Sequence, residues 1–226
     1  MSKNRSAAVV LFSGGQDSTT ALYWAKQRFE EVHAVGFDYG QKHRVELEQA
    51  RKIAQMAEVP YRVYDLRGIL SGSALTEHEA DVSGRHPLNP ELPASFVPAR
   101  NALFLTIAAG YAYQQEIHDL VGGMCQTDYS GYPDCRRDFI DAMEKSLTLA
   151  LDWEIHIHTP LMYLTKAETW KLANELGILE IVRRYTHTDY NGDRITWNEW
   201  GYGKLDNPAS ILRAKGYEEA KAKGWI

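Results

Sequence analysis

The sequence predicts the α/β class: a parallel five-stranded sheet with helices on both faces and a small C-terminal extension. The first observation is that apolar runs typical of buried strands, beginning with residues 7–12, alternate along the chain with segments of helical spacing. The second is the strand–helix–strand unit at residues 7–39, whose spacing predicts parallel strands joined by a right-handed crossover. Ligands of such sheets bind beyond the carboxyl ends of the strands.

Composition narrows the class of protein. With 226 residues, 44% of them apolar and 24% charged, the chain has enough residues for one filled core or one domain with an appendage. Its net charge of −5 argues against a general nucleic-acid-binding surface, and no apolar stretch has the ~20 residues of a membrane helix. Two cysteines and a polar start unlike a signal peptide predict a cytoplasmic protein rather than a disulfide scaffold.

The same spacing rules place the remaining elements in order along the chain. Strands are predicted at residues 7–12, 32–39, 61–66, 119–123 and 153–161. Helices are predicted at residues 17–30, 44–58, 102–113, 137–151 and 213–222. A further helix begins at Thr165, which is a plausible cap because Glu168 follows three residues later. Residues 68–98 lose all periodicity among glycines, prolines and serines, so we expect a long loop, either a lid over a site or a passive excursion.

The first strand ends at a segment that suits an anion. Residues 13–18, Ser-Gly-Gly-Gln-Asp-Ser, join it to the first helix, and the two glycines permit a tight turn with close backbone approach to a ligand. Amides of a first helical turn have no intrahelical partner, and the helix dipole favours negative charge there, so a phosphate is the natural occupant. The lysine of a Walker loop is missing, which separates this segment from that kind of phosphate loop.

Ser-Gly-Gly-x-Asp-Ser between a strand and a helix resembles the pyrophosphate loop of the N-type ATP pyrophosphatases. The resemblance implies a Rossmann-like fold of the adenine nucleotide alpha hydrolase type, with an ATP pyrophosphatase domain at residues 1–182 and an extension at residues 183–226. It also implies that the loop holds the β and γ phosphates of ATP as a leaving group while AMP passes to an acceptor oxygen. The ATP-binding residues that it implies are Phe12, Ser13, Gly14, Gly15, Gln16, Asp17, Ser18, Thr19, Gly36, Phe37, Gly123 and Arg100.

Three further segments resemble the 7-cyano-7-deazaguanine synthases, a family within that superfamily. They are residues 96–101 (Phe-Val-Pro-Ala-Arg-Asn), residues 127–136 (Thr-Asp-Tyr-Ser-Gly-Tyr-Pro-Asp-Cys-Arg) and residues 159–170. The arginine of the first segment stands at a helix start, where its guanidinium can fork a phosphate. Lys166 in the third segment also stands at a helix start and can neutralise a phosphate, unless it is a solvent lysine.

The second of these segments suits a purine-like ring. Tyr129 and Tyr132 offer stacking faces, and either Asp128 or Asp134 could accept hydrogen bonds from the 2-amino and N1–H edge. The sequence leaves the choice between the two carboxylates open. The substrate-binding residues that the resemblance implies are Tyr39, Gln41, Lys42, Asn101, Asp128, Tyr129, Tyr132, Asp134 and Arg136.

The resemblance also implies a reaction. ATP would convert the carboxylate of 7-carboxy-7-deazaguanine to an acyl adenylate, ammonia would turn the adenylate into an amide, and a second ATP would give the nitrile. The implied cofactors are ATP and Mg²⁺, with Asp17 holding the metal or bracing the loop, and the implied assembly is a homodimer. The residues suited to charge stabilisation, which form the catalytic set, are Ser13, Asp17, Ser18, Arg100 and Lys166.

The tail departs from the family. Its members resemble one another in Thr-Cys-Tyr-Asn-Gly followed by three more cysteines, a four-cysteine zinc site, but residues 188–192 here read Thr-Asp-Tyr-Asn-Gly and no cysteine follows. We therefore predict no structural zinc. Aromatic packing is expected to replace it, through Trp197, Trp200, Tyr202 and Trp225.

Two alternatives to the nitrile-forming enzyme stay open. A specialised relative in a phage-defence or modification system would join the deazaguanine acyl group to a protein amine. A non-catalytic module would bind ATP without cleaving it. Elsewhere in the chain, His156 and His158 share one strand face and are expected to be solvated rather than to ligate a metal, and Cys125 and Cys135 are expected to be small packing residues rather than nucleophiles.

Overall fold

A computed structural model describes residues 6–40, 45–70, 73, 84–127, 131–189 and 192–226. Five strands form one sheet in the order β3-β2-β1-β6-β7, and every neighbouring pair is parallel, as predicted. The strands are β1 (Ala7–Leu11), β2 (Glu31–Asp38), β3 (Tyr61–Asp65), β6 (Asp119–Val121) and β7 (His156–His158). The helices are α1 (Gln16–Lys26), α2 (Val45–Met56), α3 (Arg100–Gln114), α4 (Arg137–Leu151), α5 (Lys166–Glu175), α6 (Leu179–Tyr185) and α7 (Pro208–Ala222), with a short 3₁₀ turn, η1 (Pro133–Cys135).

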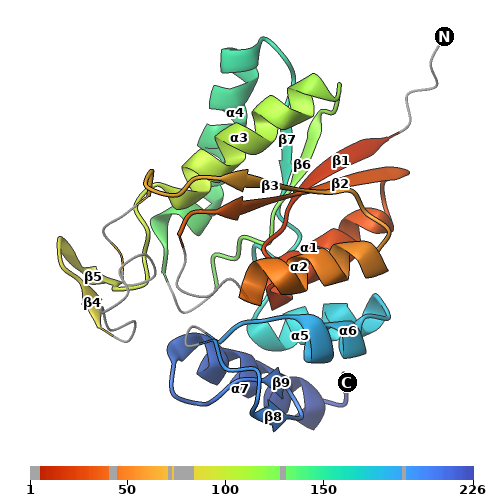
Figure 1. Cartoon of the computed structure of the whole chain (residues 1–226), viewed down its shortest axis with the longest axis vertical. Helices are drawn as coiled ribbons and strands as arrows, with labels where there is room; N and C mark the ends of the chain where they lie inside the picture. The colour runs from red at the N-terminus through yellow and green to blue at the C-terminus, as the bar shows by residue number, and fades with distance from the viewer. Residues whose placement is uncertain (1–5, 41–44, 71–72, 74–83, 128–130, 190–191) are drawn as a thin grey trace.

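The helices lie on both faces of the sheet, as predicted (Figure 1). On one face, α3 and α4 pack against side chains such as Val9 and Leu120; on the other, α1 and α2 pack against Val10 and its neighbours. This alternation along β1 follows from the two-residue period of a strand, and burial on both sides explains its continuous apolar run. Helices α5, α6 and α7 form a further layer below α1 and α2, around the fully buried Trp170.

The strand order creates a switch point beside β1. From β1 the chain crosses to β2 and β3 on one side, and from β3 it crosses back to β6 on the other. In open parallel sheets the crevice at such a point, beyond the carboxyl ends of the strands, is where ligands bind. The loop at residues 13–18 leaves β1 at this place.

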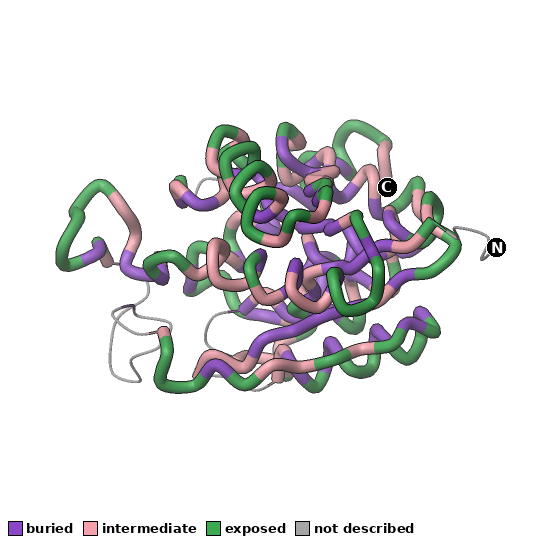
Figure 2. The backbone as a smooth tube through the Cα atoms, turned by 90° about the horizontal axis from the view of Figure 1, so that it is seen from above, coloured by how far each residue is buried: buried purple, intermediate pink, exposed green. Residues whose placement is uncertain are grey.

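The crossover from β3 to β6 corrects the prediction of an unstructured loop at residues 68–98. Within it, β4 (Arg85–His86) and β5 (Asn89–Pro93) form an antiparallel hairpin that projects from the body of the molecule (Figures 1 and 2). The prediction failed because Asn89-Pro90 and the neighbouring prolines are typical of turns, and a two-stranded hairpin needs few apolar residues when one side faces solvent. The predicted strand at residues 153–161 is also shorter, since only residues 156–158 pair with β6.

The helices of the C-terminal layer differ from the prediction. Helix α7 begins five residues earlier than expected, where Asn207 caps it by accepting from the amide of Ser210 at 3.0 Å, and α6 was not predicted. The helix is not polar all round, because one face buries Arg213, Tyr217 and other residues against α5. The sequence of residues 213–222 could not indicate this face, because apart from Tyr217 it consists of an arginine and small side chains.

Only part of the predicted aromatic packing forms in the tail. Trp200 is buried and Trp225 packs against the same apolar cluster, but Trp197 is 42% exposed and contacts Tyr202 at the surface. A polar network lies where the aspartate replaces the family's cysteine: Asp189 Oδ2 accepts from the amide of Lys204 at 2.9 Å and from Ser210 Oγ at 3.1 Å.

The described residues contain neither a membrane-spanning helix nor a cluster of metal ligands. None of the helices among them combines the length and apolarity needed to cross a bilayer. No group of three histidine, cysteine, aspartate or glutamate residues in those same ranges is placed to hold a metal ion.

Candidate active site

The loop between β1 and α1 presents polar groups around an uncapped helix start. Ser13 Oγ lies 3.1 Å from Ser18 Oγ and accepts from the amide of Gly15 at 3.4 Å. Ser18 Oγ also accepts from the amide of Ser13 at 3.3 Å, so the two hydroxyls hold the turn together. At the N-cap of α1, Gly15, no side chain of the described residues provides a cap, which leaves the amides of the first turn directed at the same place as the hydroxyls. An anion there would receive amide and hydroxyl donors and the positive end of the helix dipole.

Two glycines let other elements approach this loop closely. Gly14 has a φ of +83°, and a Cβ on it would lie 2.8 Å from the amide nitrogen of Ala50 in α2. A Cβ on Gly123, just after β6, would lie 2.9 Å from the carbonyl carbon of Asp17. Larger residues at either position would push the loop from its place, so the glycines fix it between α2 and the end of β6.

The predicted phosphate ligand Lys166 stands at the first position of α5 and reaches the loop. Its Nζ donates to both carboxylate oxygens of Asp17, at 2.9 and 3.0 Å. The Lys166 side chain is 10% exposed and that of Asp17 is 30% exposed, so the pair lies at the edge of the solvent. A capping box holds the start of α5, as the sequence predicted: Thr165 Oγ1 accepts from the amide of Glu168, and the Glu168 carboxylate accepts from the amide of Thr165.

The other loop residues are placed by their burial. Phe12, Gln16 and Thr19 are almost fully buried, so their side chains face the interior and only their backbones can line an ATP site. Gly36 allows a close approach, but to a side chain of this protein: a Cβ there would lie 2.0 Å from the hydroxyl of Tyr61. Phe37 is buried, with its ring stacked on that of Phe104 at 4.0 Å between centroids.

Arg100 links the loop side of the site to the segment expected to bind substrate. Its guanidinium lies 5.7 Å from the ring centroid of Tyr132 and hydrogen-bonds Tyr39 at the end of β2. It also faces Glu46 in the first turn of α2, whose pKa burial raises to about 7, while the Arg100 charge acts in the opposite direction. Ala99, immediately before it, has a left-handed φ of 58°, a strained conformation for a residue with a Cβ.

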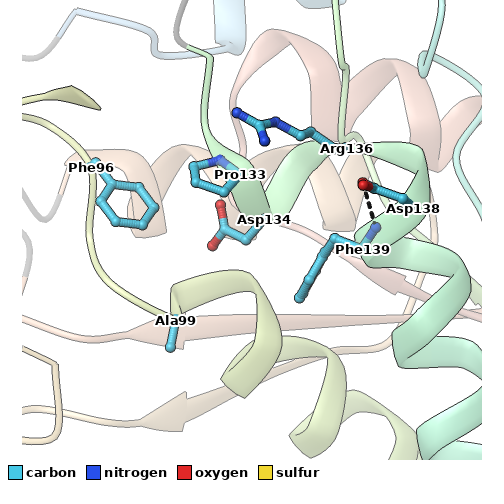
Figure 3. Close-up of a pocket in the computed structure, with 7 residues that line it drawn as sticks. All are labelled: Phe96, Ala99, Pro133, Asp134, Arg136, Asp138 and Phe139. Atoms are coloured by element: carbon cyan, nitrogen blue, oxygen red, sulfur yellow. Dashed lines mark hydrogen bonds between the residues drawn. The ribbon is translucent and has the colours of Figure 1, made fainter. Parts of the chain in front are cut away.

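A pocket of about 440 Å³ lies next to Arg100, between the start of α3 and η1 (Figure 3). Asp134 projects into it between Phe96 and Phe139, and Arg136 lines its rim. Asp134 Oδ2 accepts from the amide of Asn101 at 3.0 Å, but its buried Oδ1 has no partner among the described residues. Burial raises the pKa of this carboxyl group, and the amide of Asn101 lowers it. A buried carboxylate oxygen with unused acceptor capacity is suited to bind a donor edge of a ligand.

The pocket is tied to the segment that precedes α3. Ser95 Oγ lies 2.7 Å from the hydroxyl of Tyr132, and the Phe96 ring contacts those of Tyr132 and His86. The end of the segment at residues 68–98 therefore forms one wall of the pocket. Four residues of the predicted substrate set lie outside the described residues: Gln41, Lys42, Asp128 and Tyr129.

The cysteines and strand histidines have packing contacts. Cys125 is buried with its thiol 3.2 Å from the carbonyl oxygen of Leu164, and Cys135 accepts from the Asn101 side chain at 3.3 Å. His156 is exposed, as expected. His158 is not simply solvated, because its Nε2 lies 2.6 Å from Asp119 Oδ1 and its ring packs against two aromatic side chains of the α1 region.

The sequence did not indicate Glu46 or Arg213 as site residues, and it offered His187 only as a disfavoured metal ligand together with Asp189. His187 donates its amide to the carbonyl oxygen of Gly14 at 3.3 Å, and Arg213 is a buried residue of α7. No pattern marked Glu46 or Arg213, because an acid in a first helical turn and an arginine in a terminal helix are normally solvent-facing residues. Only the position of the tail against the loop makes them visible.

A parallel sheet of this order, whose first strand passes through a serine–glycine anion loop into an uncapped helix, defines a pyrophosphate-loop protein of the class that uses ATP. Within this class, the chain belongs to the family described as queuosine biosynthesis protein QueC, whose model matches residues 7–221.

Similar proteins agree with this assignment. A 7-cyano-7-deazaguanine synthase of Wolinella succinogenes is 48% identical over 220 residues, covering 96% of this chain and 94% of that protein. A 7-cyano-7-deazaguanine synthase of Helicobacter pylori is also 48% identical, over 218 residues, covering 95% of this chain and 96% of that protein. Among solved structures, a 4-thiouridine synthetase in complex with RNA and bound ATP matches with a TM-score of 0.52 at 19% identity, covering 94% of this chain and 53% of that chain. That likeness shows the fold alone.

Proposed function

We propose that this protein activates the carboxylate of 7-carboxy-7-deazaguanine with ATP, releasing pyrophosphate, and then forms an amide. In the first step a carboxylate oxygen bonds to the α phosphorus of ATP, the bond from that phosphorus to the β-phosphate oxygen breaks, and pyrophosphate leaves. In the second step ammonia attacks the acyl carbon and AMP leaves. The observation that carries this proposal is the start of α1, where the hydroxyls of Ser13 and Ser18 meet and Lys166 bonds Asp17 of the same loop.

Charge explains why these groups suit the first step. A carboxylate is a poor electrophile because it is anionic and lacks a good leaving group, and AMP supplies one. Negative charge grows on the departing pyrophosphate, where the loop amides, the serine hydroxyls and Lys166 can stabilise it. Arg100 lies toward the pocket side, where its fork suits the α phosphate.

Magnesium would enter with the phosphates of ATP. Asp17 is the carboxylate of the loop, and Lys166 bonds both of its oxygens, so the arrangement fits a brace for the loop better than a separate metal site. When bound, Mg²⁺ neutralises phosphate charge. The protein's own part is to hold the nucleotide in line with the carboxylate.

The deazaguanine ring would occupy the pocket at Asp134. Its volume suits a bicyclic ring, Phe96 and Phe139 supply aromatic side chains at the wall, and the Asp134 carboxylate can accept from the 2-amino and N1–H edge. This supports Asp134 for that role, while Asp128 lies outside the described residues. The names of the relatives support the same substrate class and a final nitrile.

Release of pyrophosphate from ATP tests the proposal. Purified protein is mixed with ATP, Mg²⁺ and 7-carboxy-7-deazaguanine, and pyrophosphate is measured with and without ammonia while mass spectrometry identifies acid, amide or nitrile. Lys166→Ala is expected to slow pyrophosphate release about 10²-fold, since it removes a charge that stabilises the leaving group. Lys171→Ala is the matched control, because Lys171 lies on the same helix but pairs with Glu175 at the surface.

Three outcomes distinguish the alternatives. ATP binding without pyrophosphate release would mean a non-catalytic module, and release of only the γ phosphate would contradict the adenylation step. Pyrophosphate release with little amide or nitrile, together with a partner protein that gains the mass of the deazaguanine acyl group, would indicate an amine acceptor on a protein.

The pocket assignment has its own test. Asp134→Asn keeps the size of the side chain but removes the charge that the donor edge would bind, so KM for the acid is expected to rise about 10- to 100-fold. Asp152→Asn is the matched control, because Asp152 is exposed at the end of α4. An unchanged KM in Asp134→Asn would remove Asp134 from the substrate site.

A further inference from the structure

Helix α7 contacts Lys166, the lysine that the proposed function assigns to the leaving pyrophosphate. A Cβ on Gly216 would lie 2.7 and 2.8 Å from Cγ and Cβ of Lys166 and 3.0 Å from its carbonyl carbon. The contact involves the backbone and the near end of the side chain, so Lys166 could not swing away from an added methyl group. Gly216 thus permits the close approach of α7 and α5, which Figure 1 shows side by side.

The same helix is also connected to the pyrophosphate loop, through residues 186–188. Arg213 is 1% exposed, and its Nη1 donates to Thr186 Oγ1 at 2.7 Å and to Thr188 Oγ1 at 2.8 Å. His187 lies between these threonines, and its amide donates to the carbonyl oxygen of Gly14. Nη1 of Arg213 therefore holds both ends of the segment at residues 186–188, which lies against the loop.

The remaining donors of Arg213 anchor it to the tail. Nη2 donates to the carbonyl oxygen of Val182 at 2.8 Å, and Nε donates to that of Trp200 at 3.0 Å. Burial lowers the pKa of Arg213, and the negative charge of Asp17 acts in the opposite direction. An arginine with this many fixed contacts transmits the position of its helix to its partners, which a single flexible lysine could not do.

We propose that α7 sets the separation between Lys166 and the pyrophosphate loop, with Gly216 and Arg213 as positioning residues for the diphosphate end of ATP. The choice of ligand rests on the function proposed above. Gly216 places the stem of Lys166, and Arg213 places Gly14 through the segment at residues 186–188. Neither residue touches the nucleotide.

The position of the lysine matters because its ammonium group is a point charge on a flexible stem. Its attraction for a phosphate falls as the distance grows, and it gains little when the stem is not held. In the function proposed above, the adenosine and α phosphate of the nucleotide would lie toward Arg100, where α7 makes no contact that is described. A displaced α7 should therefore weaken binding of the diphosphate and leave binding of AMP intact.

Calorimetric binding of inorganic pyrophosphate, ATP and AMP tests the proposal. Gly216→Ala is compared with Gly110→Ala, a glycine-to-alanine change in the middle of α3 where the new methyl group meets no atom within 4 Å. Arg213→Lys is the second variant, because it keeps the charge and loses the fork. Thermal unfolding is measured for all three variants.

The expected result is a loss of affinity of at least tenfold for pyrophosphate and ATP in both Gly216→Ala and Arg213→Lys, with AMP affinity within twofold of wild type. Gly110→Ala should match wild type for all three ligands. The proposal is overturned if pyrophosphate affinity stays within twofold, or if AMP affinity falls in parallel, which is the sign of a merely structural role.

Arg213→Lys decides the matter if Gly216→Ala does not fold. Failure of the proposed function is separate, because wild-type protein that binds pyrophosphate but releases none from ATP and the acid would leave the positioning proposal standing.

Discussion

His187 is 2% exposed, in the segment that lies against the loop between β1 and α1. Burial, with the nearby positive charge of Arg194 as a smaller cause, lowers its pKa to about 4. The folded protein therefore holds the neutral ring at a pH where the unfolded chain already binds a proton. At the residue scale, the buried side chain of His187 therefore couples the stability of the tail to pH.

We expect this histidine to make the protein acid-sensitive above the range of carboxylate titration. Because the folded pKa lies below the unfolded value, stability is present above about pH 6.5 and is lost as the pH falls toward 4. The loss between pH 7 and pH 5 should be about 2 kcal/mol, measured as the free energy of urea unfolding. In His187→Leu this dependence should disappear. His156→Asn, a change at an exposed histidine, is the control, and an unchanged pH dependence in His187→Leu would contradict the assignment.

Contacts of single residues could be predicted where both the residue types and their spacing match a known motif. Thr165 and Glu168 carry both the residue types and the interval of a capping box, and the box forms. Asp134 could be proposed from residue type alone, but its distinguishing feature, a buried oxygen without a partner, depends on how Asn101 and η1 pack around it. Glu46 and Arg213 acquire their surroundings from elements far away in the chain, so no local pattern could indicate them.

The start of α5 is the element on which Lys166 depends. The capping box supplies hydrogen-bond acceptors to amides at the start of the helix. The negative charge of Glu168, at the third position, also interacts favourably with the positive end of the helix dipole. Thr165→Ala should lower the free energy of unfolding by about 1 kcal/mol, while Thr165→Ser should keep most of the stability, because serine supplies the same acceptor. Urea unfolding of the two variants gives the comparison, and equal losses would mean that the hydroxyl is not the stabilising group.

Strand β2 contains a second test at this scale. Gly36 faces Tyr61 on β3 so closely that a methyl group would lie 2.0 Å from the tyrosine hydroxyl, and that hydroxyl donates to the carbonyl oxygen of Phe12 at 3.3 Å. Gly36→Ala should cost about 1–3 kcal/mol through overpacking. Combining it with Tyr61→Leu should cost less than the sum of the single changes, and a double-mutant cycle measures this coupling. Strict additivity would show that the two side chains do not compete for the same space.

Elements were predictable in proportion to their periodicity. Buried strands and amphipathic helices of the sheet region were found with their parallel order, because their apolar runs are continuous. The β4–β5 hairpin and α6 were missed because both are short, and polar or proline-rich hairpins give no alternation to detect. For α7 the predicted start was late, since Asn207-Pro208 indicates a helix start only when the cap is considered together with the serine that it binds.

At the scale of the whole molecule, one apolar cluster contains residues from both of the predicted parts, residues 1–182 and residues 183–226. Trp170 and Val182 pack with Trp200 and Tyr217 in one cluster that crosses residue 182. The division into these two parts stays a prediction. It can be tested by asking whether the two parts unfold separately.

We expect a single unfolding transition. Removing the tail from its place would expose a tryptophan that is fully buried, at a cost of about 3–5 kcal/mol by analogy with truncation of large side chains, so the sheet region should not persist alone under denaturing conditions. Urea unfolding followed by far-ultraviolet circular dichroism and by tryptophan fluorescence should give coincident curves. Two separated midpoints would instead support an independently folding domain at residues 1–182.

The crossover between β3 and β6 has a consequence for how such proteins diversify. It contributes the hairpin and one wall of the pocket, yet the parallel register of β1 with β6 is set by the sheet and not by the length of that passage. Insertions or deletions there can change the shape of the pocket while the loop between β1 and α1 keeps its place. Members of such a family could therefore come to admit a different ring into the pocket without any change in the loop that follows β1.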